Sequence, residues 1–241
     1  MLILKICDEL TDKEKSLGVR RVPPTWGAKM DAGEYFRHIA PGLTKGLDPL
    51  TPAELGCTLS HLECYSIIIR ERRSALILED DISLDDQSLK TVKHIAELGL
   101  EFTHLAQSSV FTFRGQEIDD GLYKIDPRMD FWGSAAYLVT PEFAQEVQEF
   151  HTPFVRFADA WTDFFQKRAG DSPHFSPIFF HTGETSAIQT SREMARKLSA
   201  KALLRRRALQ WGNRQMSRFP DWVQGLPPPV PRISKEWKEL S

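Results

Sequence analysis

The stretch from Thr51 to Leu78 constrains the fold of this 241-residue chain more than any other. It opens with TPAE, in which Thr51 fits a helix N-cap, Pro52 the first helical position and Glu54 the partner of a capping box. We therefore predict a helix that runs to about Arg70. Its buried side is expected to carry the apolar residues that recur at helical spacing, namely Leu55, Leu59, Leu62 and Ile69.

Strands and helices alternate along the chain. After ERRS, the apolar run Ala75–Leu78 predicts a short buried strand. Ala135–Val139 predicts another, and the following Thr140 and Pro141 cap a helix with an apolar face formed by Phe143, Val147 and Phe150. Further strands are expected in MLILKI, Thr103–Ala106 and Phe175–Phe180. The alternation predicts an α/β/α sandwich with a mostly parallel sheet, in which ligands bind beyond the carboxyl ends of the strands.

Three acids stand at one of these ends, because Glu79, Asp80 and Asp81 follow Ala75–Leu78 directly. Adjacent carboxylates repel one another, so either water or a cation must stabilise them. If the chain stays extended, Glu79 and Asp81 point one way and Asp80 the other. Two carboxylates on one side suit Mg²⁺ or Mn²⁺, which also bind the oxygens of a substrate phosphate. The alternative is a solvated acidic turn without a ligand.

Composition indicates a globular protein that does not bind nucleic acid through overall charge. The chain is 41% hydrophobic and 27% charged, with a net charge of −2. Its three cysteines have no metal-like or redox-like spacing, which favours reduced thiols and a cytoplasmic location. No apolar run approaches the roughly 20 residues that span a bilayer, and the opening MLILKICDEL is unlike a signal peptide.

The C-terminal part differs in charge from the rest. Nine basic residues and one acid, Glu193, lie between Arg192 and Arg218, and the stiff segment LPPPVPR follows. We therefore expect a catalytic domain over residues 1–191 and a basic helical extension over residues 192–241. The extension suits peripheral docking on an anionic membrane face, here the inner face of the cytoplasmic membrane. A solvated helix packed on the domain remains an equal alternative, and no motif supports nucleic-acid binding.

Several motifs resemble glycosyltransferase family 25, the lipooligosaccharide β-galactosyltransferases and their relatives. The resemblance begins with the helix and the strand that ends in Glu-Asp-Asp, and its residues are Glu54, Gly56, Cys57, Ser60, His61, Glu79, Asp80 and Asp81. FWGSAAYLV resembles a later family strand through Gly133, Ala136 and Tyr137, and RFADAWTDFF resembles an acidic segment through Asp159. The resemblance runs from about Leu50 to Arg192. The N-terminal part departs from the family, since it offers Arg20 and Arg21 but no clear second strand.

The resemblance implies an inverting, metal-dependent transferase of the GT-A type. It would move a hexose, with galactose as the favoured sugar, from a UDP-sugar to a lipooligosaccharide, lipopolysaccharide or other surface glycan. The implied metal ligands for Mn²⁺ or Mg²⁺ are Asp81 and Glu79, and Asp80 would bind donor hydroxyls or orient a ligand. Asp159 is the first choice for the base that deprotonates the acceptor, and Glu184 is the alternative.

Ser60, His61 and Tyr137 are expected to contact the donor. Ser60 and His61 cannot form a nucleophile–base pair, because neighbouring residues on a helix point in different directions. For His61 a purely structural role stays open, and for Tyr137 core packing stays open beside stacking on the donor. Two other functions also stay open. One is a non-catalytic glycan- or nucleotide-binding protein on the same scaffold, and the other is a phosphotransferase that uses the acidic strand end.

Overall fold

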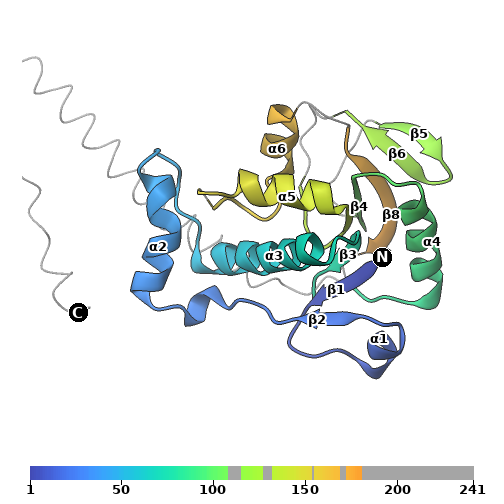
Figure 1. Ribbon diagram of the computed structural model, residues 1–241, viewed down its shortest axis with the longest axis horizontal. Coiled ribbons are helices and arrows are strands. Elements are labelled where there is room, and N and C mark those ends of the chain that lie inside the picture. The colour runs from blue at the N-terminus through green and yellow to red at the C-terminus, as the bar shows by residue number, and fades with distance from the viewer. Residues whose placement is uncertain (108–114, 127–131, 154, 169–171, 181–241) are drawn as a thin grey trace, which may run out of the picture. The chain divides into compact units, whose positions relative to one another are not determined.

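The structure is a computed structural model that describes residues 1–107, 115–126, 132–153, 155–168 and 172–180 (Figure 1). The boundary predicted near Arg192, the basic extension and Glu184 lie outside the described residues. The described elements, in chain order, are β1 (Leu2–Ile6), α1 (Asp12–Ser16), β2 (Arg20–Val22), the 3₁₀ helix η1 (Gly27–Lys29), α2 (Ala32–Leu43), α3 (Pro52–Glu71), β3 (Ala75–Leu78), α4 (Asp86–Glu97), β4 (Phe102–Gln107), β5 (Gly115–Asp119), β6 (Leu122–Ile125), β7 (Ala136–Val139), α5 (Pro141–Phe150), α6 (Trp161–Lys167) and β8 (His174–Phe180).

The sheet is mixed, so the prediction of a mostly parallel sheet is wrong. The described strands lie in the order β2-β1-β3-β7-β4-β8-β6-β5. Three of their pairings are parallel and four are antiparallel. The reason is that β7 is inserted between β3 and β4 and runs against both, while the hairpin β5–β6 adds two more antiparallel pairings. The N-terminal part also contains a second strand, β2, that the sequence did not predict.

Two hydrophobic cores lie on opposite faces of the sheet, so the sandwich has three layers. Within β3, Ala75 and Ile77 join the core beneath α3, α5 and α6. Leu76 and Leu78 join the core beneath α4. Figure 1 shows α3 and α5 on one side of the strands and α4 on the other. This alternation determines which way the residue after β3 faces.

Helix α3 carries many buried residues, and its start was predicted well. Thr51 caps it, Pro52 opens it and Glu54 completes the capping box. The predicted apolar stripe is only partly right. Leu55 is buried, whereas Leu59, Leu62 and Ile69 are only partly buried. The apolar residues buried in the second half of the helix are instead Cys64, Tyr65, Ile67 and Ile68. Polar residues, Thr58, Ser60 and His61, are buried as well, because loops and the sheet end cover the first half of the helix.

Glycines let a loop approach α3 closely. Gly56 faces the loop before η1, and a Cβ added at Gly56 would lie 2.6 Å from the backbone nitrogen of Gly27. On the same helix, Ser60 Oγ accepts a 2.8 Å hydrogen bond from the backbone N–H of Thr25. The Gly56 and Ser60 of the motif therefore fasten the loop of residues 25–27 onto the helix that carries His61.

A pair of glycine substitutions tests this close approach. Both Gly56 and Gly42 lie inside helices, where alanine is intrinsically favoured over glycine by about 1 kcal/mol. Gly56→Ala is expected to destabilise the protein by roughly 2 kcal/mol, because the new methyl group meets backbone atoms that cannot move aside. Gly42→Ala is expected to be neutral or stabilising, because its nearest neighbour is a leucine methyl at 3.6 Å.

Urea denaturation of the two variants measures the difference in the free energy of unfolding. Equal stability of Gly56→Ala and the unmodified protein would show that the loop does not press on α3.

Among the described residues, no helix is both long and apolar enough to cross a membrane.

Candidate functional site

The acidic segment forms a turn at the carboxyl end of β3. The strand ends at Leu78, and the backbone N–H of Ile82 donates to the Glu79 carbonyl at 3.3 Å. The expectation of an extended chain with Glu79 and Asp81 on one side is therefore wrong, because Asp80 and Asp81 lie inside the turn. Only Glu79 continues the strand, since its N–H donates to the Ala135 carbonyl at 2.8 Å.

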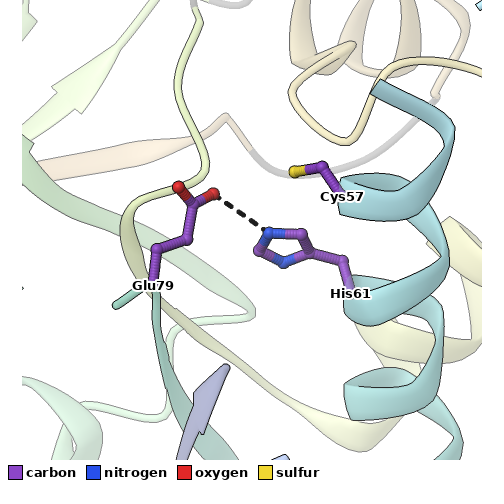
Figure 2. Close-up of side chains that lie close together, drawn as sticks. All are labelled: Cys57, His61 and Glu79. Atoms are coloured by element: carbon purple, nitrogen blue, oxygen red, sulfur yellow. Dashed lines mark hydrogen bonds and ion pairs between the residues drawn. The ribbon is translucent and has the colours of Figure 1, made fainter. Parts of the chain in front are cut away.

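Glu79 points toward α3, as the alternation in β3 requires. Its Oε1 accepts a 2.6 Å hydrogen bond from the Ser134 hydroxyl and lies 3.1 Å from His61 Nε2. His61 is buried, while the Glu79 side chain is 24% exposed. Figure 2 shows the imidazole reaching from α3 to this carboxylate. The structure thus brings His61 to Glu79 and fixes one carboxylate oxygen from two sides.

The contact continues inward through two tyrosines. His61 Nδ1 lies 2.6 Å from the Tyr137 hydroxyl, which lies 2.9 Å from the Tyr65 hydroxyl. Burial raises the pKa of Tyr65 and of Tyr137 above the usual value, so both remain protonated. We call Tyr65, Tyr137, His61, Glu79 and Ser134 the buried polar chain.

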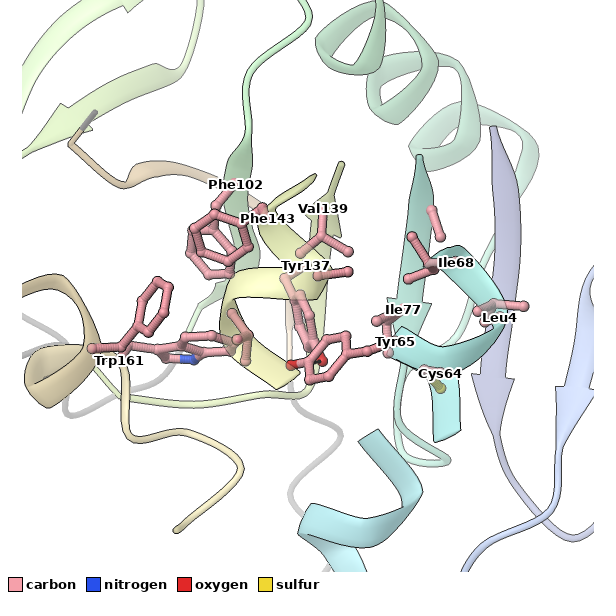
Figure 3. Packing of buried hydrophobic residues seen from close by; sticks show 14 of the residues in the cluster. Leu4, Cys64, Tyr65, Ile68, Ile77, Phe102, Tyr137, Val139, Phe143 and Trp161 are labelled. Carbon is pink, nitrogen blue, oxygen red and sulfur yellow. Dashed lines mark hydrogen bonds between the residues drawn. The ribbon is translucent and has the colours of Figure 1, made fainter. Parts of the chain in front are cut away.

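Tyr137 belongs to the core, which is one of the two roles left open for it. Its ring is fully buried and lies 5.9 Å from the ring of Phe102 and 5.4 Å from that of Trp161, centroid to centroid (Figure 3). The ring therefore packs within the protein, while its hydroxyl contacts His61.

Ser60 is buried too and, in addition to its contact with Thr25, donates to the Gly56 carbonyl at 2.8 Å.

The other two acids of the turn face more water than the strand before them. Asp80 is exposed and Asp81 is half-buried. Partial desolvation raises the pKa of Asp80, and the nearby negative charges of Asp81 and Glu79 raise it further. The turn therefore concentrates carboxylate charge at the carboxyl end of β3.

A buried lysine, which the sequence analysis did not single out, holds the far end of this turn. Lys5 Nζ donates to the Ile82 carbonyl at 2.8 Å and forms an ion pair with Glu14 at 2.6 Å. Hydrogen bonds from Lys5 and Thr11 lower the pKa of Glu14 against the opposing effect of its burial. The one signal in the sequence was a lysine inside the apolar run MLILKI.

Gly133 positions the segment before β7 next to Glu79. Its φ of +103° is a backbone conformation that favours glycine, and its carbonyl accepts hydrogen bonds from Trp161 Nε1 at 2.7 Å and His104 Nε2 at 3.0 Å. These bonds position Ser134, the next residue. The FWGSAAY motif therefore supplies a donor to Glu79 that the sequence analysis missed.

Asp159 lies on a neighbouring segment. It is half-buried in a turn, and α6 begins only at Trp161. Asp159 therefore lies outside the helix that carries Asp163. The segment before Asp159 is bound to α3, because the Thr58 hydroxyl lies 2.9 Å from the Arg156 carbonyl. His151, on the same segment, is buried, and this burial lowers its pKa to about 4, with a further contribution from nearby Arg156.

Together, the fold and the site define an α/β protein in which three carboxylates stand beyond the carboxyl end of a central strand. A family model described as glycosyltransferase family 25 (LPS biosynthesis protein) matches residues 42–161, about half of the chain. The chain belongs to glycosyltransferase family 25. A comparison with curated proteins returns no matching relative. Membership supports a glycosyltransferase of lipopolysaccharide biosynthesis, with a sugar donor and an acceptor as partners.

Proposed function

We propose that the chain is an inverting, metal-dependent transferase that moves galactose from UDP-galactose to a lipooligosaccharide or lipopolysaccharide acceptor. The observation that carries the proposal is the position of Glu79, Asp80 and Asp81 at the carboxyl end of β3, inside the matched region. In open α/β sheets, ligands bind beyond the carboxyl ends of the strands. A carboxylate fixed by both Ser134 and His61 is positioned in advance of any ligand.

The donor chemistry of the acidic turn fits a hard divalent cation. All three side chains offer carboxylate oxygens, the ligands that Mg²⁺ and Mn²⁺ prefer, and their crowded negative charge favours a cation. Glu79 and Asp81 are the proposed ligands. When bound, such an ion would neutralise the charge that develops on the leaving diphosphate. Asp80, the most exposed of the three, is free to face donor hydroxyls.

Other residues of the chain would hold the donor and activate the acceptor. Lys5 fixes the end of the acidic turn, and the buried polar chain fixes its beginning. The exposed indole of Trp132 stands two residues before Ser134 and offers a face for stacking on a sugar or a base. We assign Asp159 as the base that removes the acceptor proton, with Glu184 as the alternative.

The acceptor suggests where the protein works. A cytoplasmic enzyme that modifies a lipid-anchored glycan gains from a basic segment that docks on the inner face of the membrane, and Arg192–Arg218 is the proposed segment. Sedimentation with anionic vesicles should fall when residues 192–241 are deleted and when salt is raised. Unchanged binding of the truncated protein would exclude this role.

A nucleotide screen tests the proposed function. UDP-galactose with Mn²⁺ at about a hundred times its dissociation constant should stabilise the protein by about 2.7 kcal/mol, which raises the melting temperature by roughly 5 °C or more. Other nucleotide-sugars should raise it less, and Mn²⁺ should enhance the effect of UDP alone. Transfer of labelled galactose to a lipopolysaccharide extract completes the test.

The screen also separates the competing functions. A protein stabilised by glycans or UDP that transfers nothing would be the non-catalytic binding protein. Stabilisation by nucleoside triphosphates without any preference for a sugar would indicate the phosphotransferase. Failure of every uridine nucleotide to shift the melting temperature would contradict the proposed donor.

A further inference from the structure

A second set of potential ligands meets at Glu79, and it differs in kind from the acidic turn. Cys57 and His61 lie four residues apart on α3, so their side chains project from one face of the helix on successive turns. Figure 2 shows both facing the Glu79 carboxylate. One sulfur, one ring nitrogen and one carboxylate oxygen lie within 4.8 Å of one another. We propose that Cys57, His61 and Glu79 bind a zinc ion.

The donor atoms select the metal. Thiolate, imidazole and carboxylate are the three ligand types that zinc takes in proteins, whereas Mg²⁺ and Ca²⁺ take oxygen. Three protein ligands leave one tetrahedral position for water or a substrate atom, which is the pattern of an open zinc site. A thiol would contribute little to a magnesium site, so Cys57 is the residue that separates this site from the acidic turn.

The spacing of two ligands already suits zinc. His61 Nε2 and Glu79 Oε1 lie 3.1 Å apart. Zinc bonds of about 2.0–2.1 Å at a tetrahedral angle separate neighbouring nitrogen and oxygen ligands by roughly 3.3 Å. In the metal-free protein a hydrogen bond joins the same two atoms. Zinc therefore replaces a hydrogen bond without moving the backbone, and Cys57 completes the site through its side-chain rotamer.

The surroundings supply the contacts that zinc ligands need. A zinc-bound histidine donates its other N–H to a hydrogen-bond partner, and His61 Nδ1 lies 2.6 Å from the Tyr137 hydroxyl. The Ser134 hydroxyl orients the Glu79 carboxylate in the same way, at 2.6 Å. His61 is buried, but Cys57 and Glu79 are both partly exposed, so a metal ion can enter from solvent.

Cobalt(II) titration of the reduced full-length chain tests the site, because cobalt reports its own ligands. A near-ultraviolet charge-transfer band from the thiolate and the visible bands of tetrahedral cobalt should both saturate at about one ion per chain. An equimolar amount of zinc should remove both sets of bands. Cys57→Ala should lose the charge-transfer band and bind cobalt at least about a hundredfold more weakly. Absence of the band in the unmodified protein would overturn the proposal.

Matched variants locate the ligands. Cys64→Ala removes another α3 thiol that is buried in the core, outside the ligand group, and should leave the spectrum unchanged. Glu79→Gln should weaken cobalt binding, and its near-isosteric amide keeps the turn folded. Asp81→Asn should retain the band, because Asp81 is not in the ligand group. Retention of the band in Cys57→Ala, or its loss in Cys64→Ala or Asp81→Asn, would contradict the assignment. None of these spectra depends on sugar transfer, so the proposed function stands or falls separately.

Discussion

The Asp81→Asn variant is expected to lose sugar transfer by at least about a hundredfold while it remains folded. The amide keeps the shape of the side chain but removes the negative charge that would hold the cation against the donor diphosphate. Asp81 is half-buried and precedes Ile82, whose carbonyl is fixed by Lys5, so the turn keeps its other contacts in the variant. Metal-dependent binding of UDP should disappear together with transfer.

Asp86→Asn is the matched control for this prediction. Asp86 is an exposed acid five residues farther along, at the start of α4, and it lies outside the acidic turn. It should retain full transfer and full binding of UDP. Calorimetric titration with UDP and Mn²⁺, together with a rate measurement, compares the two variants. Undiminished activity in Asp81→Asn would refute the metal assignment for this residue.

The Asp159→Asn variant is expected to lower kcat by about 10²- to 10⁴-fold with little change in the KM for the donor. A base acts on the acceptor hydroxyl in the transition state, so its removal affects the chemical step more than donor binding. The position of Asp159 supports this role. Trp161, two residues later, donates to the Gly133 carbonyl, and the neighbouring Ser134 donates to Glu79.

Two further variants assign the base. Asp163→Asn removes an exposed acid in the first turn of α6 and should leave kcat unchanged. Glu184→Gln should also retain activity if Asp159 is the base. In the unmodified protein, kcat should fall at acidic pH as the base becomes protonated. This fall should disappear only in the variant that lacks the base. A large loss in Glu184→Gln with normal activity in Asp159→Asn would reverse the assignment.

Local sequence predicted the elements whose ends carry their own signals. Thr51, Pro52 and Glu54 place the start of α3 at the residue observed, and Thr140 and Pro141 do so for α5. Caps are short-range, since the side chain bonds a backbone N–H only three residues away. The apolar run of β3 was equally clear, and it placed the acids at a strand end.

The residues that the sequence analysis missed act across long sequence separations. Ser134 meets Glu79 only because β7 runs antiparallel beside β3, so that β7 begins where β3 ends. Nothing local to either strand specifies that pairing. Lys5 reaches Ile82 for a similar reason, because β1 runs parallel beside β3 and places Lys5 next to the turn that follows β3. Polar burial on α3 also depends on loops that are distant in sequence, which is why the predicted apolar stripe was only partly right.

The sequence by itself determined the family, the capped helix, the apolar strand and the three acids that follow it, because each is written in contiguous residues. Only the tertiary structure decided what those acids contact. It turned Asp80 and Asp81 away from the strand and aimed Glu79 at Cys57 and His61 on α3. The physical reason is that strand order and direction determine which side chains meet. The sheet here is mixed, and the pattern of any one strand does not reveal the direction of its neighbour.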